Sequence, residues 1–464
     1  MSDETGIEAK NTRAGRRVIL DTDIGTDIDD AMALALLLAC PEYKLEGCTA
    51  AYIPESCPGR GDRLSEMFGH RLYPLKFRRL QILRKLLDLA GAYDIKAITG
   101  TTGLFKREGR IYWNGYEGWN LPCNEYDPSL FDNISAEDYI IGRVSKHPSD
   151  IDIISIGPMT NIARAFEKNP EVMSLVNRII FMGGHIEGEK EHNFSSDPEA
   201  VEKVFQSDVP LVMVGAEITR KTAIRSHEIE ILERSGSFFG RAVTELLHTY
   251  IKRFDRDWTY MHDPFTVFVA VNSNHMSFEE IEVTVKREGR IVPGRGRKIL
   301  RLMEKDGIFE DFNSFLVKRL ETHFKYLQSK NVNMFVSGSG LKGEEELCRR
   351  TAEFLYRNRA NYIYGGSDTG RAICNIYKKL EGEKHIYHNI FEFRPSMKDF
   401  KRQNSVNHHQ MVYNRNSDMY EMRRQTISLA HTVICLGGGK GSKEEEIMAK
   451  EFNKKILYVS SFED

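Results

Sequence analysis

The chain has 464 residues, of which 41% are hydrophobic and 28% are charged, and its formal net charge is -2. This length exceeds what one compact core usually contains, so we expect two or three domains. The balance of 65 basic and 67 acidic residues argues against a global electrostatic attraction to nucleic acid or to an anionic membrane. We therefore expect no nucleic-acid partner and no membrane partner.

The cysteines and the N-terminus indicate the compartment. Seven cysteines are present without a CxxC pair, which excludes a recognisable zinc or disulfide framework and predicts reduced residues in a cytoplasmic protein. Residues 1–15 are polar and lack an apolar signal core, so we expect a flexible tail. The longest apolar stretch, residues 31–40, is too short to span a bilayer.

Short apolar runs alternate with helical patterns along most of the chain. RVILD (17–21) predicts a buried strand, and AMALALLLA (31–39) predicts the buried helix that follows it. Further buried strands are expected at 44–53, 94–100, 151–157, 178–184 and 210–216. Helical stretches such as TNIARAFEKN and PEAVEKVFQS separate several of them. The alternation predicts an α/β fold with a mainly parallel sheet.

Two other regions differ from this pattern. Residues 58–92 are basic with amphipathic helical spacing, which favours a solvated or interface helix around Phe77 to Leu89 over a nucleic-acid patch. A long helical pattern near 316–332 is followed by a second series of strands that begins with MFVSGSG (334–340). We predict a first domain at 16–325 and a smaller, Rossmann-like α/β domain at 330–464.

The segment LDTDIGTDIDDAMA carries the densest group of acidic residues. It has five aspartates within ten positions, between a buried strand and a buried helix, namely Asp21, Asp23, Asp27, Asp29 and Asp30. The carboxyl ends of strands in open α/β sheets line ligand crevices. Carboxylates this close disfavour joint ionisation unless a counter-charge is present, and Ca²⁺ accepts several carboxylate and carbonyl oxygens in flexible geometry. One or two aspartates would suit a polar loop with a helix cap, whereas five predict a calcium site.

This segment resembles the signature of the nucleoside hydrolases of the inosine-uridine preferring type, which reads DTD, glycine and then DDA. Four later segments resemble the motifs of the same family in the same order: SIGPMTNIA (155–163), FMGG (181–184), EHNFSSDPEA (191–200) and MHDPF (261–265). The resemblance covers roughly residues 16–320. It implies an N-ribohydrolase that uses calcium to cleave a nucleoside or a nucleotide-derived riboside such as NAD.

The resemblance also implies roles for individual residues. Asp23, Asp30 and Asp263 would be calcium ligands, with the backbone carbonyl of Ile156 as a fourth. Asp23 would in addition take the proton from the attacking water, which makes it the catalytic base.

The remaining roles concern the sugar and the base. Asp29 would hold a ribose hydroxyl, and Glu191 and Asn193 would grip the far side of the sugar. His262 would lie near the leaving base, which needs a proton that a histidine can supply near neutral pH. Acidic side chains suit this reaction because positive charge develops on the ribose as the N-glycosidic bond breaks.

Three features leave alternatives open. Two extra residues separate DTD from DDA, so Asp27 competes for a role given to Asp29 or Asp30. AYIPESC (51–57) stands where the family has Gly-Asn, so Glu55 is an alternative sugar contact. His262 also has a structural interpretation, in which it orients Asp263.

Three glycine-rich loops follow apolar runs in the second domain: FVSGSG (335–340), YIYGGSDTGRA (362–372) and LGGGKGSKEEE (436–446). Glycines let backbone N–H groups approach a phosphate closely. The set predicts a nucleotide or sugar-phosphate crevice that involves Gly338, Ser339, Gly365, Gly366, Gly438, Gly439, Gly441, Ser442 and Glu445.

These loops resemble the superfamily of cytokinin-activating phosphoribohydrolases and SLOG ligand sensors, over about residues 332–464. In the region where the enzymes have His-Glu-Arg-Lys, Tyr420 replaces the histidine and Met422 falls at the arginine, with Arg423 or Arg424 as shifted alternatives. An arginine is not freely interchangeable in position, so this departure favours ligand sensing over catalysis.

Three functions are compatible with the sequence. The first is a ribohydrolase regulated by a nucleotide effector at the second domain, an architecture that resembles bacterial stress or antiphage effectors by analogy alone. The second is a bifunctional N-glycosidase in which both domains cleave, and the third is a non-catalytic nucleotide-binding switch. Both resemblances imply a homo-oligomer.

Overall fold

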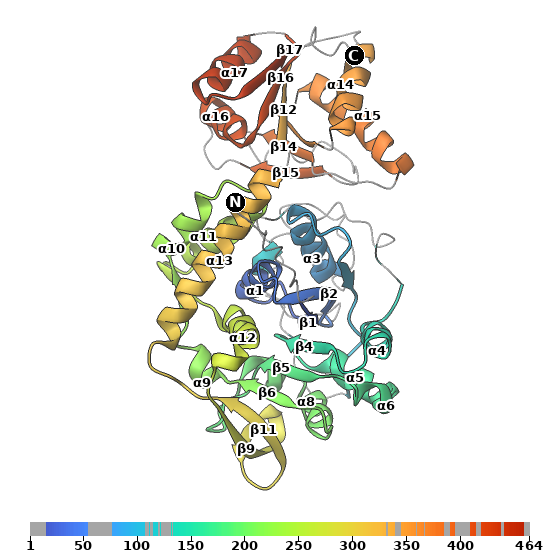
Figure 1. The fold of residues 1–464 in the computed structure, drawn as a ribbon, viewed down its shortest axis with the longest axis vertical. Coiled ribbons are helices and arrows are strands. Elements are labelled where there is room, and N and C mark those ends of the chain that lie inside the picture. The colour runs from blue at the N-terminus through green and yellow to red at the C-terminus, as the bar shows by residue number, and fades with distance from the viewer. Residues whose placement is uncertain are drawn as a thin grey trace, which may run out of the picture.

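The structure is a computed structural model in which α/β elements form two large sheets (Figure 1), and a third sheet has only two strands. It describes residues 15–53, 77–106, 111, 115–118, 121, 131, 133–330, 333–338, 345–358, 360–365, 367–384, 390–394, 409–413, 419–437 and 440–458. The predicted tail at 1–15 lies outside these residues apart from its last position. None of the helices in the described part of the chain combines the length and the apolar character that a membrane span requires.

The first sheet has nine strands in the order β10-β9-β11-β6-β5-β4-β1-β2-β3, and only the pairings of β9 with β10 and β11 are antiparallel. Both of its edge strands have three residues. Its strands are β1 (Arg16–Thr22), β2 (Tyr43–Ala50), β3 (Lys96–Ile98), β4 (Ile151–Ser155), β5 (Arg178–Met182), β6 (Leu211–Val214), β9 (Phe278–Val285), β10 (Ile291–Pro293) and β11 (Arg297–Leu302). The mixed α/β fold with a mainly parallel sheet is therefore confirmed.

Both faces of this sheet are buried, as continuous apolar strands require. Val18 and Leu20 of β1 pack into one hydrophobic cluster with several helices, whereas Ile19 points into a second cluster on the opposite face. The helices of this part are α1 (Asp29–Leu38), α3 (Arg78–Leu89), α4 (Ala136–Lys146), α5 (Thr160–Lys168), α6 (Pro170–Met173), α7 (His192–Ser196), α8 (Pro198–Phe205), α9 (Ala216–Thr219), α10 (Ser226–Glu233), α11 (Phe238–Arg253), α12 (His262–Val271) and α13 (Ile308–Lys330). A two-stranded ribbon, β7 (Ala223–Arg225) with β8 (Trp258–Tyr260), pairs antiparallel.

Helix α3 corrects one expectation from the sequence. Residues 58–76 of the basic segment lie outside the described residues; the helix expected around Phe77 to Leu89 is present, but it is buried instead of solvated. Arg78 and Arg79 are each 1% exposed and Lys85 is 2% exposed, so these cations are not presented as a surface patch. The hydrophobic residues of the same helix, such as Leu83, pack into the main core, which explains its amphipathic spacing.

The second sheet has six strands in the order β15-β14-β13-β12-β16-β17, and all neighbouring pairs are parallel. Helices α14 and α15 lie on one side of it and α16 and α17 on the other, and α13 leads into it from the first sheet (Figure 1). The elements are β12 (Asn333–Ser337), α14 (Glu345–Arg357), β13 (Asn361–Tyr364), α15 (Asp368–Lys384), β14 (Ile390–Arg394), β15 (His409–Tyr413), α16 (Met419–Leu429), β16 (Thr432–Cys435), α17 (Lys440–Glu451) and β17 (Lys455–Tyr458).

Candidate active site

A pocket of about 310 Å³ opens at the carboxyl ends of the central strands of the first sheet. Asp23 follows β1, Ile156 follows β4, and Ala216 follows β6, as expected for a parallel sheet whose strand ends form a ligand crevice. The lining residues are Asp23, Thr26, Asp27, Asp29, Asp30, Ile156, Met182, Lys190, Glu191, His192, Asn193, Ala216, Arg220, His262 and Asp263. All eight residues predicted from the sequence to form the catalytic, metal and sugar sites lie in this one pocket.

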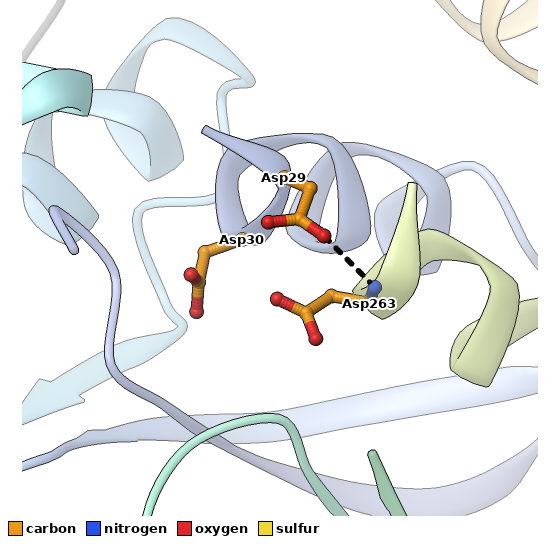
Figure 2. A group of neighbouring side chains, drawn as sticks. All are labelled: Asp29, Asp30 and Asp263. Atoms are coloured by element: carbon orange, nitrogen blue, oxygen red, sulfur yellow. Dashed lines mark hydrogen bonds between the residues drawn. The ribbon is translucent and has the colours of Figure 1, made fainter. Parts of the chain in front are cut away.

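Three carboxylates converge in the pocket: Asp29, Asp30 and Asp263 each offer an oxygen, and these oxygens lie within 4.8 Å of one another. Figure 2 shows the first two at the start of α1 and the third at the start of α12. The Asp263 backbone N–H donates to Asp29 Oδ2 at 3.1 Å, which joins the two helix ends. Asp30 accepts a hydrogen bond from Thr22 at the end of β1.

The electrostatics of these three groups suit a bound cation. All three are buried, and burial together with repulsion from neighbouring carboxylates, Asp23 among them, raises the pKa of Asp29 to about 6 and the pKa values of Asp30 and Asp263 well above the usual range. Arg79, the buried cation beside this cluster, is turned toward Asp23. Carboxylate oxygens at this spacing fit a hard divalent ion.

Asp23 differs from this group of three in its charge state. Although burial opposes the effect, the neighbouring His192 and the charge of Arg79 lower its pKa below the usual range. His192 Nε2 is 3.8 Å from Asp23 Oδ2, and Arg79 Nη2 is 4.0 Å from the same oxygen. Asp23 is therefore held as an ionised carboxylate, the state that a proton acceptor needs.

Glu191 and Asn193, which the sequence predicts to contact the sugar, are fixed by the start of a short helix. Glu191 caps α7 by accepting from the backbone N–H groups of Asn193 at 2.8 Å and Phe194 at 3.1 Å, and it also accepts from Gly184 N–H at 3.0 Å. Asn193 Nδ2 donates to the carbonyl of Ile156 at 3.1 Å. These contacts fix the orientation of both side chains in the pocket wall.

His262 begins α12, next to Asp263. Its Nδ1 lies 2.8 Å from Thr219 Oγ1, and its ring packs against Tyr260 with centroids 5.0 Å apart. Burial lowers its pKa below the ordinary value, which favours the neutral ring. Because Thr219 holds Nδ1, His262 Nε2 is the ring nitrogen left for a ligand.

The structure adds residues that the sequence motifs did not indicate. Glu117, fully buried in a 3₁₀ turn (Tyr116–Gly118), accepts from the backbone N–H groups of Gly25 and Ala31. Arg79 Nη1 donates to the carbonyl of Ile24 at 2.7 Å. Both contacts join parts of the chain more than 50 residues apart, so no local motif could reveal them.

The second sheet carries a smaller polar cluster at the carboxyl edge of β12. Ser337 Oγ donates to Glu445 Oε2 at 2.6 Å, and Arg423 Nε lies 3.4 Å from Glu445 Oε1. Burial raises the pKa of Glu445. Gly338, Gly365, Gly441 and Ser442 also belong to the described residues, whereas Ser339, Gly366, Gly438 and Gly439 lie outside them, as does Glu55.

Comparison with known proteins supports the hydrolase interpretation of the first part. Residues 78–336 match the family described as inosine-uridine preferring nucleoside hydrolase. The pyrimidine-specific ribonucleoside hydrolases RihA of Salmonella arizonae and of Escherichia coli O139:H28 are each 28% identical over 292 residues, which cover 60% of this chain and 86% of the relative.

Solved structures agree with this match. The plant nucleoside hydrolase PpNRh1 has a TM-score of 0.56 at 26% identity and covers 66% of this chain and 99% of its own. The purine-preferring ribonucleoside hydrolase of Gardnerella vaginalis has a TM-score of 0.56 at 23% identity, with coverage of 67% and 100%, and supports the fold alone.

The chain belongs to the inosine-uridine preferring nucleoside hydrolase family. It is accordingly an N-ribohydrolase, an enzyme that hydrolyses the N-glycosidic bond of a ribonucleoside.

Proposed function

We propose that this enzyme hydrolyses ribonucleosides or nucleotide-derived ribosides in a calcium-dependent reaction. The observation that carries the proposal is the convergence of Asp29, Asp30 and Asp263 within 4.8 Å in the same pocket as Glu191 and Asn193. A group of buried carboxylates with raised pKa values beside sugar-binding polar groups suits a cation under a ribose.

Asp30, Asp263 and Asp23 would hold the calcium ion together with the Ile156 carbonyl, and the position of Asp29 beside Asp263 allows it to contribute as well. When bound, the cation lowers the pKa of the attacking water and neutralises the carboxylates around it. Calcium suits this set better than magnesium because it tolerates irregular oxygen geometry.

The side chains of the pocket account for the remaining steps. Asp23, kept ionised by His192 and Arg79, accepts the proton of the water that attacks the anomeric carbon. The surrounding carboxylates stabilise the positive charge that develops on the ribose, and more strongly in the transition state than in the ground state.

The remaining residues bind the substrate and assist departure of the base. Asp29 and Glu191 accept hydrogen bonds from the ribose hydroxyls, while Asn193 is held by the Ile156 carbonyl so that it contacts the sugar. His262 Nε2 is free of the Thr219 contact and would donate a hydrogen bond to the departing base.

A substrate panel tests this proposal directly. We expect the purified protein, incubated with calcium and separate ribonucleosides, nucleotides and NAD, to release at least one free base that mass spectrometry identifies. Tight binding by calorimetry without release of any base from the whole panel would contradict the hydrolytic function and would favour a non-catalytic switch.

For residues 330–464 we propose a Rossmann-like, SLOG-type nucleotide-binding domain, distinct from the hydrolase domain at 16–325, that regulates hydrolysis. The parallel order of its six strands and the Ser337–Glu445 cluster at a strand end support a nucleotide crevice. Such an effector-regulated hydrolase, as a homo-oligomer, would suit a bacterial stress or antiphage response.

The position of Arg423 favours an alternative in which this second domain also cleaves an N-glycosidic bond. Its guanidinium contacts both Glu444 at 2.6 Å and Glu445 at 3.4 Å, so an arginine is next to the buried carboxylate despite the shifted sequence position. If the domain cleaves, an Asp23→Asn enzyme will still release adenine from AMP, and Glu445→Ala in that background will abolish the release. If it only senses, AMP will stay intact in both variants, and Glu445→Ala will instead weaken nucleotide binding measured by calorimetry.

A further inference from the structure

The candidate active-site pocket carries opposite charges at its floor and at its mouth. The aspartates of the proposed metal site are buried, so they form the floor. Lys190 and Arg220 also line the pocket, but their side chains are 47% and 46% exposed, which places them where the pocket meets solvent. A ligand that fills the pocket therefore meets acidic groups at its inner end and basic groups at its outer end.

Both cations have acidic partners that stand outside the pocket. Lys190 Nζ lies 2.9 Å from Glu288 Oε2, in a 3₁₀ turn (Arg287–Gly289), and Arg220 Nη1 donates to Glu189 Oε2 at 2.7 Å. Neither glutamate belongs to the described lining of the pocket, and the side chains of both are half exposed. Exposed ion pairs of this kind contribute little to stability, so each cation can exchange its glutamate for an anionic ligand.

Two separate segments present these cations beside the residues that we assign to the sugar and the base. Lys190 directly precedes Glu191, which caps α7. Arg220 directly follows α9, where Thr219 Oγ1 lies 2.8 Å from His262 Nδ1. The charge of Arg220 also acts on His262, so its guanidinium lies toward the base side. The basic groups at the mouth are therefore next to both the sugar wall and the base side.

The stereochemistry of a ribonucleoside determines which of its groups points to the mouth. The base and the 5′-carbon lie on one face of the sugar ring, and the 2′- and 3′-hydroxyls lie on the opposite face. A diol turned toward the aspartates therefore directs the 5′-carbon away from them. A phosphate on the 5′-oxygen would extend toward Lys190 and Arg220, whose flexible ammonium and planar guanidinium are both suited to phosphate oxygens.

We propose that Lys190 and Arg220 bind the 5′-phosphate of the substrate, so that 5′-phosphorylated ribonucleosides are preferred over free ribonucleosides. This assignment rests on the proposed hydrolase function, because it takes the ribose diol to face the aspartates. The phosphate is either terminal, as in a mononucleotide, or part of the bridge of a dinucleotide such as NAD.

The experiment compares kcat/KM within two pairs, AMP with adenosine and NAD with nicotinamide riboside. Base that Asp23→Asn still releases is assigned to the second domain and subtracted. For the wild-type enzyme we expect the phosphorylated member of at least one pair to be favoured by about tenfold or more, the scale of hydrogen bonds to charged groups. Lys190→Gln and Arg220→Gln should each move this ratio toward one. A preference in the first pair alone identifies a terminal phosphate, and a preference in the second shows that a bridging phosphate is accepted.

The glutamate partners supply matched variants. Glu288→Gln breaks the same ion pair as Lys190→Gln but leaves the cation without its competitor, so it should raise the preference for the phosphorylated substrate. Lys221→Gln is the control for Arg220→Gln, because Lys221 pairs with Glu304 and is not part of the described pocket lining. It should leave the ratio unchanged. If the ion pair only held the loop in place, Lys190→Gln and Glu288→Gln would shift the ratio in the same direction, which would contradict the assignment.

The ratio between two substrates does not depend on how much enzyme is folded, so a destabilised variant still gives a valid answer. Wild-type ratios of one or below in both pairs, or an unchanged ratio in the Lys190→Gln/Arg220→Gln double variant, would overturn the phosphate assignment while base release upholds the hydrolase function. If no base is released, calorimetry with AMP in the presence of calcium decides. Binding that the double variant weakens supports the phosphate site although the hydrolase function fails, and equal binding overturns both.

Discussion

Asp23→Asn is expected to lower kcat by roughly 10³-fold, within the usual range for removal of a general base. The amide cannot accept the proton from the attacking water. It also lacks the negative charge that pairs with His192 and Arg79, the two residues that hold the native carboxylate ionised. The kcat of the variant and of the wild type is measured from steady-state release of the free base, on protein whose fold has been verified.

Asp21 provides a matched control for this variant. It is as buried as Asp23 and only two residues away, but it lies outside the pocket lining and is bonded to Thr49 and Asn161. Burial raises its pKa to about 7, so an asparagine resembles its protonated form. Asp21→Asn should keep a kcat close to that of the wild type, and a kcat for Asp23→Asn near the wild-type value would remove Asp23 from the proposed base role.

We expect removal of the divalent cation to abolish hydrolysis. We also expect it to reverse the way in which the stability of the folded protein depends on pH. A carboxyl group whose pKa is higher in the folded than in the unfolded state makes the folded state bind more protons, so stability is lost as pH rises. For Asp29 this loss runs from its ordinary pKa of 3.8 through about 6, and for Asp30 and Asp263 it continues higher.

Thermal unfolding with and without calcium measures this effect. The melting temperature of chelated protein should fall as pH rises through that window, and the increase produced by calcium should grow over the same window. Asp263→Asn removes one of the repelling charges and one ligand, so it should flatten the pH dependence of the chelated protein and weaken calcium binding by at least the roughly 10–100-fold that loss of an outer-shell partner costs. Full activity after exhaustive chelation would contradict a metal-dependent reaction.

Much of the fold could be predicted from the sequence because its central strands are buried on both faces. Continuous apolar runs such as LVMV at β6 have no other stable environment in a protein of this composition. The strands β9 and β11 were not predicted, since FEEIEVTV and RKILRL mix charged and apolar residues at an exposed end of the sheet.

The site was predictable to the extent that its residues belong to local motifs. The DTD-to-DDA segment, the Glu-x-Asn segment and His-Asp-Pro all lie in the pocket. The sequence did not predict which of these residues contact one another. The group of three carboxylates contains Asp29, while Asp23 pairs with His192 and Arg79. Glu117 carries no motif, and its contacts with the acidic loop depend entirely on the tertiary fold.

The short strands at both ends of the nine-stranded sheet, β3 and β10, bear on how copies of this protein avoid misassembly. A long unpaired strand invites pairing with another chain, whereas three residues offer few free N–H and C=O groups, and β10 ends in Pro293, which has no N–H to donate. Continuous cross-chain sheets and fibrils are therefore disfavoured at these positions, and an orderly complex of several copies would use the outer faces of helices.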